Sequence, residues 1–422
     1  MKILVTGGMG FIGSHLVEKL LLLNHHVVVI DDLSVGKLKN LKKFKDSKKL
    51  DFHKLNITNF DKIQPLFRKV DVVFHLAALA DIVPSIENPK KYFEANVTGS
   101  QNVFLSSLKH KVKKFIYTAS SSCYGIPKKY PTREDSEINP KYPYALSKNI
   151  GEQLILHYSK LYGLSTTSLR LFNVYGPRAR TSGTYGAVFG VFLGQKINSL
   201  PLTIVGNGKQ KRDFTYVDDV VEALKTSMNR KQSGEIFNVG SARSVSVNHI
   251  ANLIGGKKVN IPDRPGEPRQ TFADIKKIQR EMKWKPKISI EKGVKLLIQN
   301  INTFKDAPAW TPKKIKLNSR IVIRIIDFFG SYKALPELKE SIFNLFENKS
   351  VEYLDFYYHG IPNLYINKLG LSIKSANSKK IIPNYFEPFI RENIKINFAI
   401  KGKLTKNRFF LFKGDCDQER PN

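Results

Sequence analysis

The chain has 422 residues, of which 41% are hydrophobic, so it is long enough for two or three domains with buried cores. Its net charge of +33 would suit nucleic-acid binding, but the excess comes mostly from Lys and is spread along the chain, which is typical of a solvated surface. The two cysteines, Cys123 and Cys416, exclude a disulfide framework and fit a reducing cytoplasm.

No long apolar run is visible, so we expect no transmembrane segment. A strand-like KILVTGG begins directly after Met1 and leaves no room for a signal peptide. We therefore expect a cytoplasmic protein.

The first 120 residues alternate between two patterns. Short Val- and Ile-rich runs at 2–7, 27–32, 70–78 and 112–121 predict strands, and the stretches 11–23 and 99–109 predict helices. Alternating strands and helices indicate an α/β fold, a Rossmann-type doubly wound parallel sheet covered by helices on both faces. Such sheets bind ligands at the carboxyl ends of their strands.

The rest of the chain is organised differently. After about residue 170, Gly/Pro-rich segments predict a smaller, loop-rich substrate-binding domain. A composition break at 306–314 separates this part from a third stretch in which the patterns restart, strand-like at 320–330, helix-like at 334–349 and strand-like at 351–360. We therefore expect a catalytic unit at 1–312, mainly NAD-binding over 1–172 and mainly substrate-binding over 173–312, and a separate C-terminal α/β module at 315–422, to which we assign no activity.

A glycine-rich turn, TGGMGFIG, follows the first predicted strand and opens the first predicted helix. Gly7, Gly10 and Gly13 would allow a tight turn, close approach of a pyrophosphate and close packing of the helix on the sheet. Asp31 ends the second strand, 18 residues after Gly13, where an acid binds the ribose hydroxyls of adenosine. A carboxylate there repels a 2′-phosphate, which favours NAD over NADP, although Lys37 and Lys39 lie nearby.

Tyr144 and Lys148 form a YxxxK pair on a predicted helix, where both side chains share one face. The ammonium and the positive charge of oxidised NAD favour a tyrosine phenolate, which can remove a hydroxyl proton. A second YxxxK pair, Tyr124 and Lys128, contains Gly and Pro and should not be helical.

The strand FIYTAS ends in three serines. From that position Ser120 could hydrogen-bond both a substrate hydroxyl and the tyrosine oxygen. We interpret Cys123 as a small buried hydrophobe rather than a nucleophile. The nine histidines show no metal-ligand spacing, so we expect no metal.

These residues are recognisable together. The chain resembles the extended short-chain dehydrogenase/reductases, specifically the NAD-dependent nucleotide-sugar epimerases and dehydratases of the UDP-glucose 4-epimerase type. The resemblance covers roughly residues 1–305 and rests on stretches that run in family order, among them TGGMGFIGSHL, HLAALADIVPS, TASSSCYG, YPYALSK, LRLFNVYGPR, KRDFTYVDDV and DRPGEPRQTFADIKKIQREMKWKP.

The resemblance implies a role for each matching residue. It implies NAD as the cofactor, a nucleotide-diphospho-sugar as the substrate, a homodimer, and Ser120, Tyr144 and Lys148 as the catalytic set. Where relatives carry Asp, this chain has Asn56, whose carbonyl can still accept a hydrogen bond from the adenine amino group. The implied cofactor-binding residues are Gly7, Gly10, Phe11, Ile12, Gly13, Asp31, Asn56, Ile57, Ala77, Asn96, Tyr144 and Lys148, and the implied substrate-binding residues are Ser120, Asn173, Arg212, Arg264 and Glu267.

The expected reaction is redox-neutral epimerisation, most simply at C4 of the sugar. Dehydratases of this family commonly carry an Asp-Glu pair directly after the catalytic Ser/Thr, and this chain has Ser121 and Ser122 there. A dehydratase, a decarboxylase or a reductase on the same scaffold remains an alternative. A non-catalytic NAD-binding scaffold protein is a more distant one, because such a protein would not need the Ser-Tyr-Lys set. The sequence does not reveal the sugar or the nucleotide base.

Overall fold

The computed structural model describes residues 1–179, 188–230, 233–261 and 268–300 in full, and the backbone of six strands between 315 and 415. The chain divides into two compact units, Met1–Ala309 and Trp310–Asn422.

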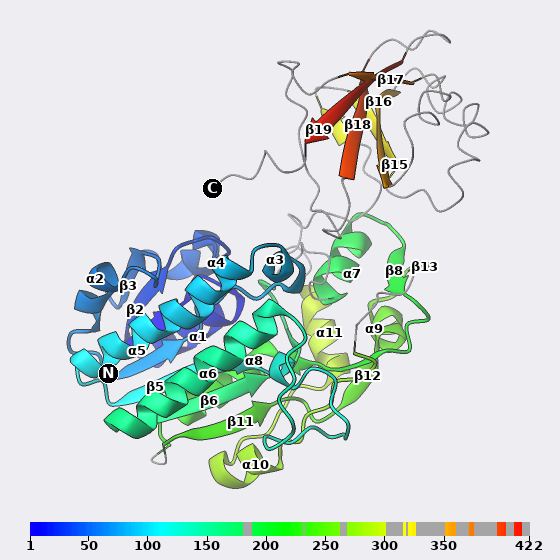
Figure 1. Ribbon diagram of the computed structural model, residues 1–422. Coiled ribbons are helices and arrows are strands. Elements are labelled where there is room, and N and C mark those ends of the chain that lie inside the picture. The colour runs from blue at the N-terminus through cyan, green and yellow to red at the C-terminus, as the bar shows by residue number, and fades with distance from the viewer. Residues whose placement is uncertain are drawn as a thin grey trace. The chain divides into compact units, whose positions relative to one another are not determined.

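The first unit is built on a seven-stranded sheet in which all neighbouring strands are parallel (Figure 1). This confirms the predicted Rossmann-type fold. In spatial order the strands are β11 (Glu235–Val239), β6 (Thr166–Leu171), β5 (Lys114–Ser120), β4 (Val72–His75), β1 (Lys2–Thr6), β2 (His26–Asp31) and β3 (Leu50–Lys54).

The direction in which the strand order grows reverses between β1 and β4. In doubly wound sheets ligands bind at such a switch point, outside the carboxyl ends of the strands. The glycine turn follows β1, Ala77 lies in the segment that follows β4, and Ser120 is the last residue of β5, so all three lie at that edge.

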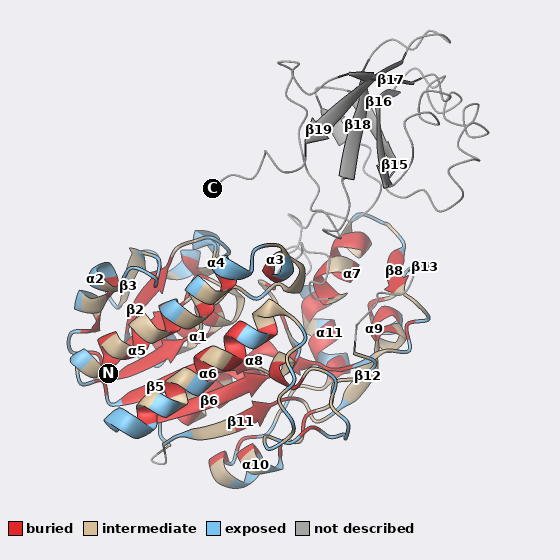
Figure 2. Cartoon of the chain, viewed as in Figure 1, coloured by how far each residue is buried: buried red, intermediate tan, exposed pale blue. Residues whose placement is uncertain are grey.

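Alternate residues of the central strands face two separate apolar layers. Ile3 and Val5 of β1 belong to one buried cluster, and Leu4 belongs to the other. Because side chains alternate across a strand, a sheet covered on both faces needs apolar residues at every position, which explains the unbroken Val/Ile runs. Figure 2 shows these strands buried and the outward faces of the helices exposed.

The helices of the first unit flank this sheet and cover the smaller sheets. They are α1 (Phe11–Leu22), α2 (Phe60–Ile63), α3 (Ile82–Glu87), α4 (Pro89–Phe93), α5 (Gly99–Lys109), α6 (Pro143–Tyr162), α7 (Val188–Ile197), α8 (Val217–Ser227), α9 (Val247–Ile254), α10 (Lys276–Met282) and α11 (Ile290–Gln299). Short 3-10 segments lie at η1 (Leu38–Phe44), η2 (Gln64–Phe67) and η4 (Ser121–Tyr124), and η3 (Glu94–Thr98) is a π-helix. Within the described ranges no helix combines the length and apolarity needed to cross a bilayer.

Three two-stranded sheets follow β6 in the chain. They pair β7 (Val174–Tyr175) with β10 (Thr215–Tyr216), β9 (Lys211–Asp213) with β12 (Ser244–Ser246), and β8 (Leu202–Val205) with β13 (Lys258–Ile261). Between them, β11 returns to the main sheet beside β6. The chain thus leaves the main sheet and rejoins it, in the part where Gly/Pro-rich segments follow residue 170.

The second unit contains a six-stranded mixed sheet in the order β14-β15-β16-β18-β19-β17. Two of its strands, β15 and β16, lie where the sequence predicts strands, whereas the helix expected between them lies outside the described residues. The strands are β14 (Ile315–Leu317), β15 (Arg320–Ile325), β16 (Val351–His359), β17 (Leu371–Lys374), β18 (Lys395–Lys401) and β19 (Phe409–Asp415).

Candidate active site

The turn between β1 and α1 has no room for side chains at two of its glycines. Gly7 has φ +70°, and a Cβ there would approach the Ala77 backbone nitrogen to 2.7 Å. A Cβ on Gly13 would overlap the carbonyl oxygen of Gly7. At Gly10 a Cβ would meet nothing within 4 Å except that oxygen, at 3.2 Å, so the backbone is open on this side. The turn is therefore a cradle that a small group can approach closely at the N-terminus of α1.

The start of α1 suits an anion. Its first turn contains no acidic residue, and no side chain caps its free backbone N–H groups. These groups and the helix dipole attract phosphate. Phe11 and Ile12, the first two residues of the helix, are partly buried against the main core.

Asp31 is fixed beside the glycine turn. Its carboxylate accepts hydrogen bonds from the Met9 backbone nitrogen at 2.9 Å and from the Leu33 backbone nitrogen at 2.8 Å. Burial raises the pKa of Asp31, and the two hydrogen bonds oppose this shift. A Cβ on Gly36 would come within 2.7 Å of the carboxylate, so the loop after β2 folds closely around it.

Asn56 is engaged in its own turn. Its Oδ1 accepts hydrogen bonds from both the backbone nitrogen and the hydroxyl of Thr58, each at 2.9 Å. Its Nδ2 donates to the Asp32 carboxylate at 3.3 Å, where an aspartate would bring two carboxylates together. The neighbouring Ile57 is buried, and a Cβ on Gly99 would press on its side chain. The carbonyl that we expect to face adenine thus already has two donors.

Asn96 holds the segment after β4. It is fully buried in the π-helix η3, where its Oδ1 accepts from the Leu79 nitrogen at 2.8 Å and its Nδ2 donates to the Leu79 oxygen at 3.0 Å. The same Nδ2 lies 3.0 Å from the Ser147 hydroxyl of α6. Its amide therefore connects the Ala77–Leu79 backbone to α6 and shapes this end of the site from behind.

Ser120 and Tyr144 come together at the carboxyl edge of the sheet. Ser120 ends β5, and its Oγ lies 2.8 Å from that of Ser122 and accepts from the Ser122 backbone nitrogen. Both serine hydroxyls act on the phenol of Tyr144, the second residue of α6, and favour its phenolate by lowering its pKa. The sequence predicts this role for Ser120 alone. Ser122 was missed, because the sequence pattern does not distinguish it from an ordinary polar residue at the end of a strand.

Lys148 lies one turn further along α6 and is buried. Its Nζ sits 4.4 Å from the centre of the Tyr117 ring. Burial lowers the pKa of Lys148 to about 7, and Glu152 opposes this shift. Burial raises the pKa of Tyr144, although the two serine hydroxyls favour its phenolate. In the protein alone, burial therefore disfavours the Tyr144 phenolate and the Lys148 ammonium more than their neighbours favour them. The expected phenolate needs a further positive charge beside it.

The second YxxxK pair is not a site. Gly125 has φ +61° and ends the short η4 segment that contains Tyr124. The Tyr124 hydroxyl is buried and donates to Asn238 Oδ1 at 2.8 Å, whereas Lys128 is exposed and pairs with Glu137.

Cys123 is buried and burial raises its pKa to about 12, so the thiolate does not form at neutral pH.

The predicted substrate residues are only partly placed. Asn173 follows β6, is exposed, and accepts a hydrogen bond from the Thr271 hydroxyl at 2.8 Å. Arg212 of β9 is largely buried and donates to the Lys211 oxygen at 2.9 Å. Arg264 and Glu267 lie outside the described residues.

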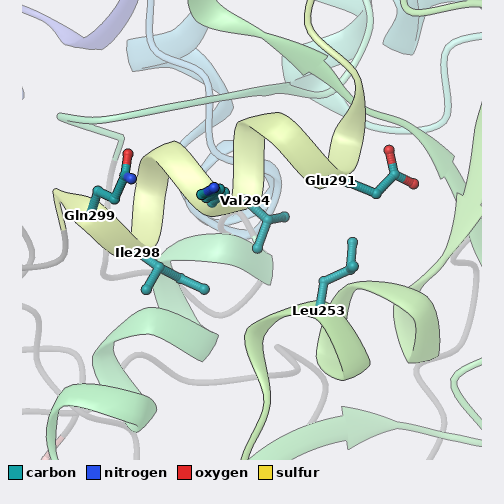
Figure 3. Close-up of a pocket in the computed structure, with 6 residues that line it drawn as sticks. Leu253, Glu291, Val294, Ile298 and Gln299 are labelled. Atoms are coloured by element: carbon teal, nitrogen blue, oxygen red, sulfur yellow. The ribbon is translucent and has the colours of Figure 1, made fainter.

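Two further features bear on the site. In the described part of the chain, no group of three or more His, Cys, Asp or Glu residues could hold a metal ion. A hollow of about 300 Å³ lies between α9 and α11, and Figure 3 shows the residues that line it, none of which is a predicted site residue. Its lining residues are Leu253, Glu291, Val294, Lys295, Ile298 and Gln299.

Known proteins match this chain over the first unit. Residues 3–240 match the model of the NAD dependent epimerase/dehydratase family. A putative UDP-glucose 4-epimerase of Methanocaldococcus jannaschii is 37% identical over 304 residues, which are 70% of this chain and 97% of the relative.

Solved structures agree with these sequence matches. The UDP-glucose 4-epimerase of Thermotoga maritima with UDP-glucose is 35% identical with a TM-score of 0.68, and the match covers 72% of this chain and 99% of that one. The UDP-glucuronic acid 4-epimerase of Bacillus cereus, solved with UDP-glucuronic acid and NAD, is 34% identical with a TM-score of 0.67 over 72% and 99% of the two chains.

The similarity is not confined to epimerases. A UDP-N-acetyl-alpha-D-glucosaminuronate decarboxylase of Bacillus cytotoxicus is 33% identical over 315 residues, 71% of this chain and 97% of the relative. Overall similarity therefore identifies the fold and the family, but it does not by itself distinguish an epimerase from a decarboxylase. With its parallel sheet, its glycine turn and its match to the family model over more than half its length, the chain belongs to the NAD dependent epimerase/dehydratase family.

Proposed function

We propose that this protein epimerises a nucleotide-diphospho-sugar at C4, with no net oxidation, using bound NAD. The observation that carries the proposal is the position of Tyr144 beside Ser120 and Ser122, whose hydroxyls favour its phenolate, with buried Lys148 one helical turn away. This set can move a hydroxyl proton and stands at the carboxyl edge of a sheet that also carries a dinucleotide cradle.

The described residues fit NAD. The open backbone at Gly10 and the uncapped N-terminus of α1 would hold its pyrophosphate, and the Asp31 carboxylate would accept from the adenosine ribose. Tyr144 and Lys148 would contact the nicotinamide ribose. When bound, oxidised NAD supplies the acceptor and later the donor of the C4 hydrogen, and a positive charge near the phenol.

Tyr144 acts as the base and then as the acid. Ser120 and Ser122 orient its oxygen and stabilise the phenolate, and the Lys148 ammonium stabilises the same negative charge. Tyr144 takes the C4 hydroxyl proton as the carbonyl forms, and returns it after the 4-keto sugar has presented its opposite face. Asn173, Arg212, Arg264 and Glu267 would hold the nucleotide diphosphate while the sugar turns.

Among the alternatives, a dehydratase needs groups that this chain does not carry at the positions where the resemblance places them. A 4,6-dehydratase must also remove a C5 proton and expel the C6 hydroxyl. Here Ser121 and Ser122 follow Ser120, and Ser122 is committed to Ser120 and Tyr144. A reductase would release its cofactor on each turn, and a scaffold protein would not turn over at all.

A product analysis tests the proposal. Purified protein is incubated with hexoses and hexuronic acids linked to UDP, dTDP, GDP and CDP, and the products are identified by NMR. We expect one or more sugars to be converted to their C4 epimer. A C4 keto-deoxy sugar, a pentose, or no conversion of any member of the panel would contradict the proposal.

The retained cofactor is expected to be NAD and not NADP. Asp31 lies at the end of β2 with its carboxylate fixed by two backbone N–H groups, so a 2′-phosphate would meet a negative charge. The protein is denatured and the released nucleotide is identified by mass. Asp31→Ser is the informative variant, because it should lose NAD and gain tolerance for NADP. Recovery of the 2′-phosphorylated form from the unmodified protein would contradict the assignment.

We also propose that catalysis needs only residues 1–312, divided as the sequence predicts. The described site residues all precede residue 310, and the second unit forms a sheet of its own. A chain ending near Lys316 should therefore bind NAD and turn over with an unchanged kcat. If this chain folds and retains NAD but is inactive, residues 317–422 belong to the site.

A homodimer is a further part of the proposal. The helices α5 and α6 lie side by side on one face of the sheet, and α6 exposes Leu146, Leu161 and Tyr162 to solvent (Figures 1 and 2). A second copy would cover these apolar side chains. Sedimentation equilibrium should give twice the chain mass, and Leu161→Glu should reduce it to one. A monomeric parent protein would exclude this interface.

We place the reaction in the cytoplasm, because the chain has two cysteines and Cys123 is a buried free thiol. Subcellular fractionation of the source cells tests this, with activity expected in the cytoplasmic fraction.

A further inference from the structure

The face of α6 that carries the proposed catalytic pair continues to a third ionisable residue. Tyr144, Lys148 and Glu152 follow one another at intervals of four residues, so they lie on one side of the helix. The Glu152 carboxylate pairs with Arg170 of β6 at 2.6 Å, and their side chains are only 2% and 5% exposed. The Ser168 hydroxyl donates to the same carboxylate at 2.5 Å.

Arg170 extends this pair toward the serines. Its Nη1 donates to the Tyr124 hydroxyl at 2.9 Å and to the Glu134 backbone oxygen at 3.2 Å. Tyr124 in turn donates to Asn238 of β11. Because Tyr124 ends η4, the segment that begins directly after Ser120, the network connects the helix of Tyr144 and Lys148 to the segment of Ser120 and Ser122.

Burying two charges costs desolvation free energy that their attraction only partly offsets. Replacing such a pair with apolar side chains is often neutral or stabilising, so stability alone does not explain the Glu152–Arg170 pair. The neighbouring Lys148 suggests a second role for it. The Lys148 ammonium is close to Glu152 of its own helix, to Tyr117 of β5 and to His75 of β4. Tyr144 lies one turn before it on the same helix, and the charge of Asp81 acts on the Tyr144 phenol.

The charges around Lys148 differ in kind. His75 is buried between the hydroxyls of Thr6 and Ser100, and burial holds its pKa well below the usual range, so it stays neutral. Burial also raises the pKa of Tyr117, which stays a neutral phenol. Glu152 is thus the anionic neighbour that counteracts the burial of the ammonium.

We propose that Glu152, held in place by Arg170, is a positioning residue that keeps Lys148 in its ammonium form at neutral pH and so sets the upper pH limit of the reaction. This inference rests on the proposed function, because it assigns Lys148 a part in catalysis. Arg170 has two tasks: it holds the Glu152 carboxylate in place, and through Tyr124 it keeps η4 against α6.

The direct test observes the lysine and needs no substrate. Protein labelled with ¹³C at the lysine Cε is titrated by NMR, and the Lys148 resonance is identified by its loss in Lys148→Met. Glu152→Gln removes the carboxylate charge with little change of shape and leaves Arg170 positive. Both effects disfavour the ammonium, so the midpoint of Lys148 should fall by about one pH unit or more.

The chain offers an internal reference and a matched control. Burial also lowers the pKa of Lys114, to about 8, and Lys114 begins β5 at the end opposite Ser120. Its midpoint should not move in Glu152→Gln. Glu281→Gln makes the same change in another largely buried pair, with Arg230 at 2.6 Å, and should leave Lys148 unchanged. An unmoved Lys148 in Glu152→Gln, or an equal shift in Glu281→Gln, would overturn the proposal.

A second variant covers the case in which Glu152→Gln does not fold. Glu152→Leu with Arg170→Met removes both charges and leaves neither unpaired, a replacement that proteins commonly tolerate. The midpoint of Lys148 should again fall, because the lost carboxylate lies on its own helix face. A folded double variant in which Lys148 titrates as in the parent would contradict the proposal.

Kinetics then connect the charge to the reaction. In Glu152→Gln the basic limb of kcat against pH should move down with the Lys148 midpoint, while Glu152→Asp, which keeps the charge, should restore much of the difference. If no sugar nucleotide is converted by the parent protein, the proposed function fails while the NMR result still decides the role of Glu152. If the lysine shifts and the basic limb of kcat does not, the inference fails while the function stands.

Discussion

Tyr144→Phe is expected to lower kcat by about 10²- to 10⁴-fold, the range that a positioned acid–base group contributes. The variant loses the one oxygen that Ser120 and Ser122 orient beside Lys148. It should retain NAD, because the glycine turn and Asp31 remain intact. The measurement is kcat on the sugar that proves to be the substrate, together with the NAD content of the purified variant.

The matched control lies on the same helix. Tyr158→Phe also removes one phenol oxygen from α6, there bound to Gln101 at 3.0 Å, and should leave kcat unchanged. Comparable losses in the two variants would mean that the effect is structural. Full activity of Tyr144→Phe would remove Tyr144 from the mechanism.

Gly13→Ala is expected to abolish NAD retention. An added Cβ would overlap the Gly7 carbonyl oxygen and contact the Gly8 backbone, so the turn or the start of α1 must move. Overpacking of this kind costs about 1–3 kcal/mol, and here the displaced atoms form the cradle itself. The readouts are the released nucleotide and the free energy of unfolding in urea.

Gly163→Ala separates the cradle from general loss of stability. Gly163 caps the C-terminus of α6 with φ +74°, and an added Cβ would meet nothing within 4 Å. Alanine in this left-handed conformation costs about 1–2 kcal/mol, a penalty similar to that of Gly13→Ala. Only the Gly13 variant should lose NAD. Equal retention in both would show that the turn does not hold the cofactor.

Local patterns made the fold of the first unit and the position of its glycine turn predictable. The Val/Ile runs of β1, β2, β4 and β5 are buried on both faces, so each is continuous and easily found. β3 was not predicted, because its residues are half-exposed at the edge of the sheet. The glycine turn was predictable because its requirements are local: Gly7 and Gly13 leave no room for a Cβ, and Gly10 keeps the backbone open.

Long-range partners were not predictable. Nothing local to Asn96 indicates that its amide will be used up by Leu79, 17 residues away, and by Ser147, 51 residues away. The same holds for Glu152, whose partner Arg170 is visible only once β6 lies beside α6. Asn56 differs, because its partner is local. Its side-chain oxygen accepts a hydrogen bond from Thr58, two residues away, whereas the sequence predicts that it accepts one from the adenine of the cofactor.

A sugar nucleotide deuterated at C4 tests the central claim most directly. Proton removal by Tyr144 with transfer of the C4 hydrogen to enclosed NAD and back predicts a C4 epimer of unchanged mass that still carries its deuterium at C4. Loss of the label to solvent would contradict hydrogen return from an enclosed cofactor. A product lighter by one water or one carbon dioxide would show that the scaffold performs another reaction.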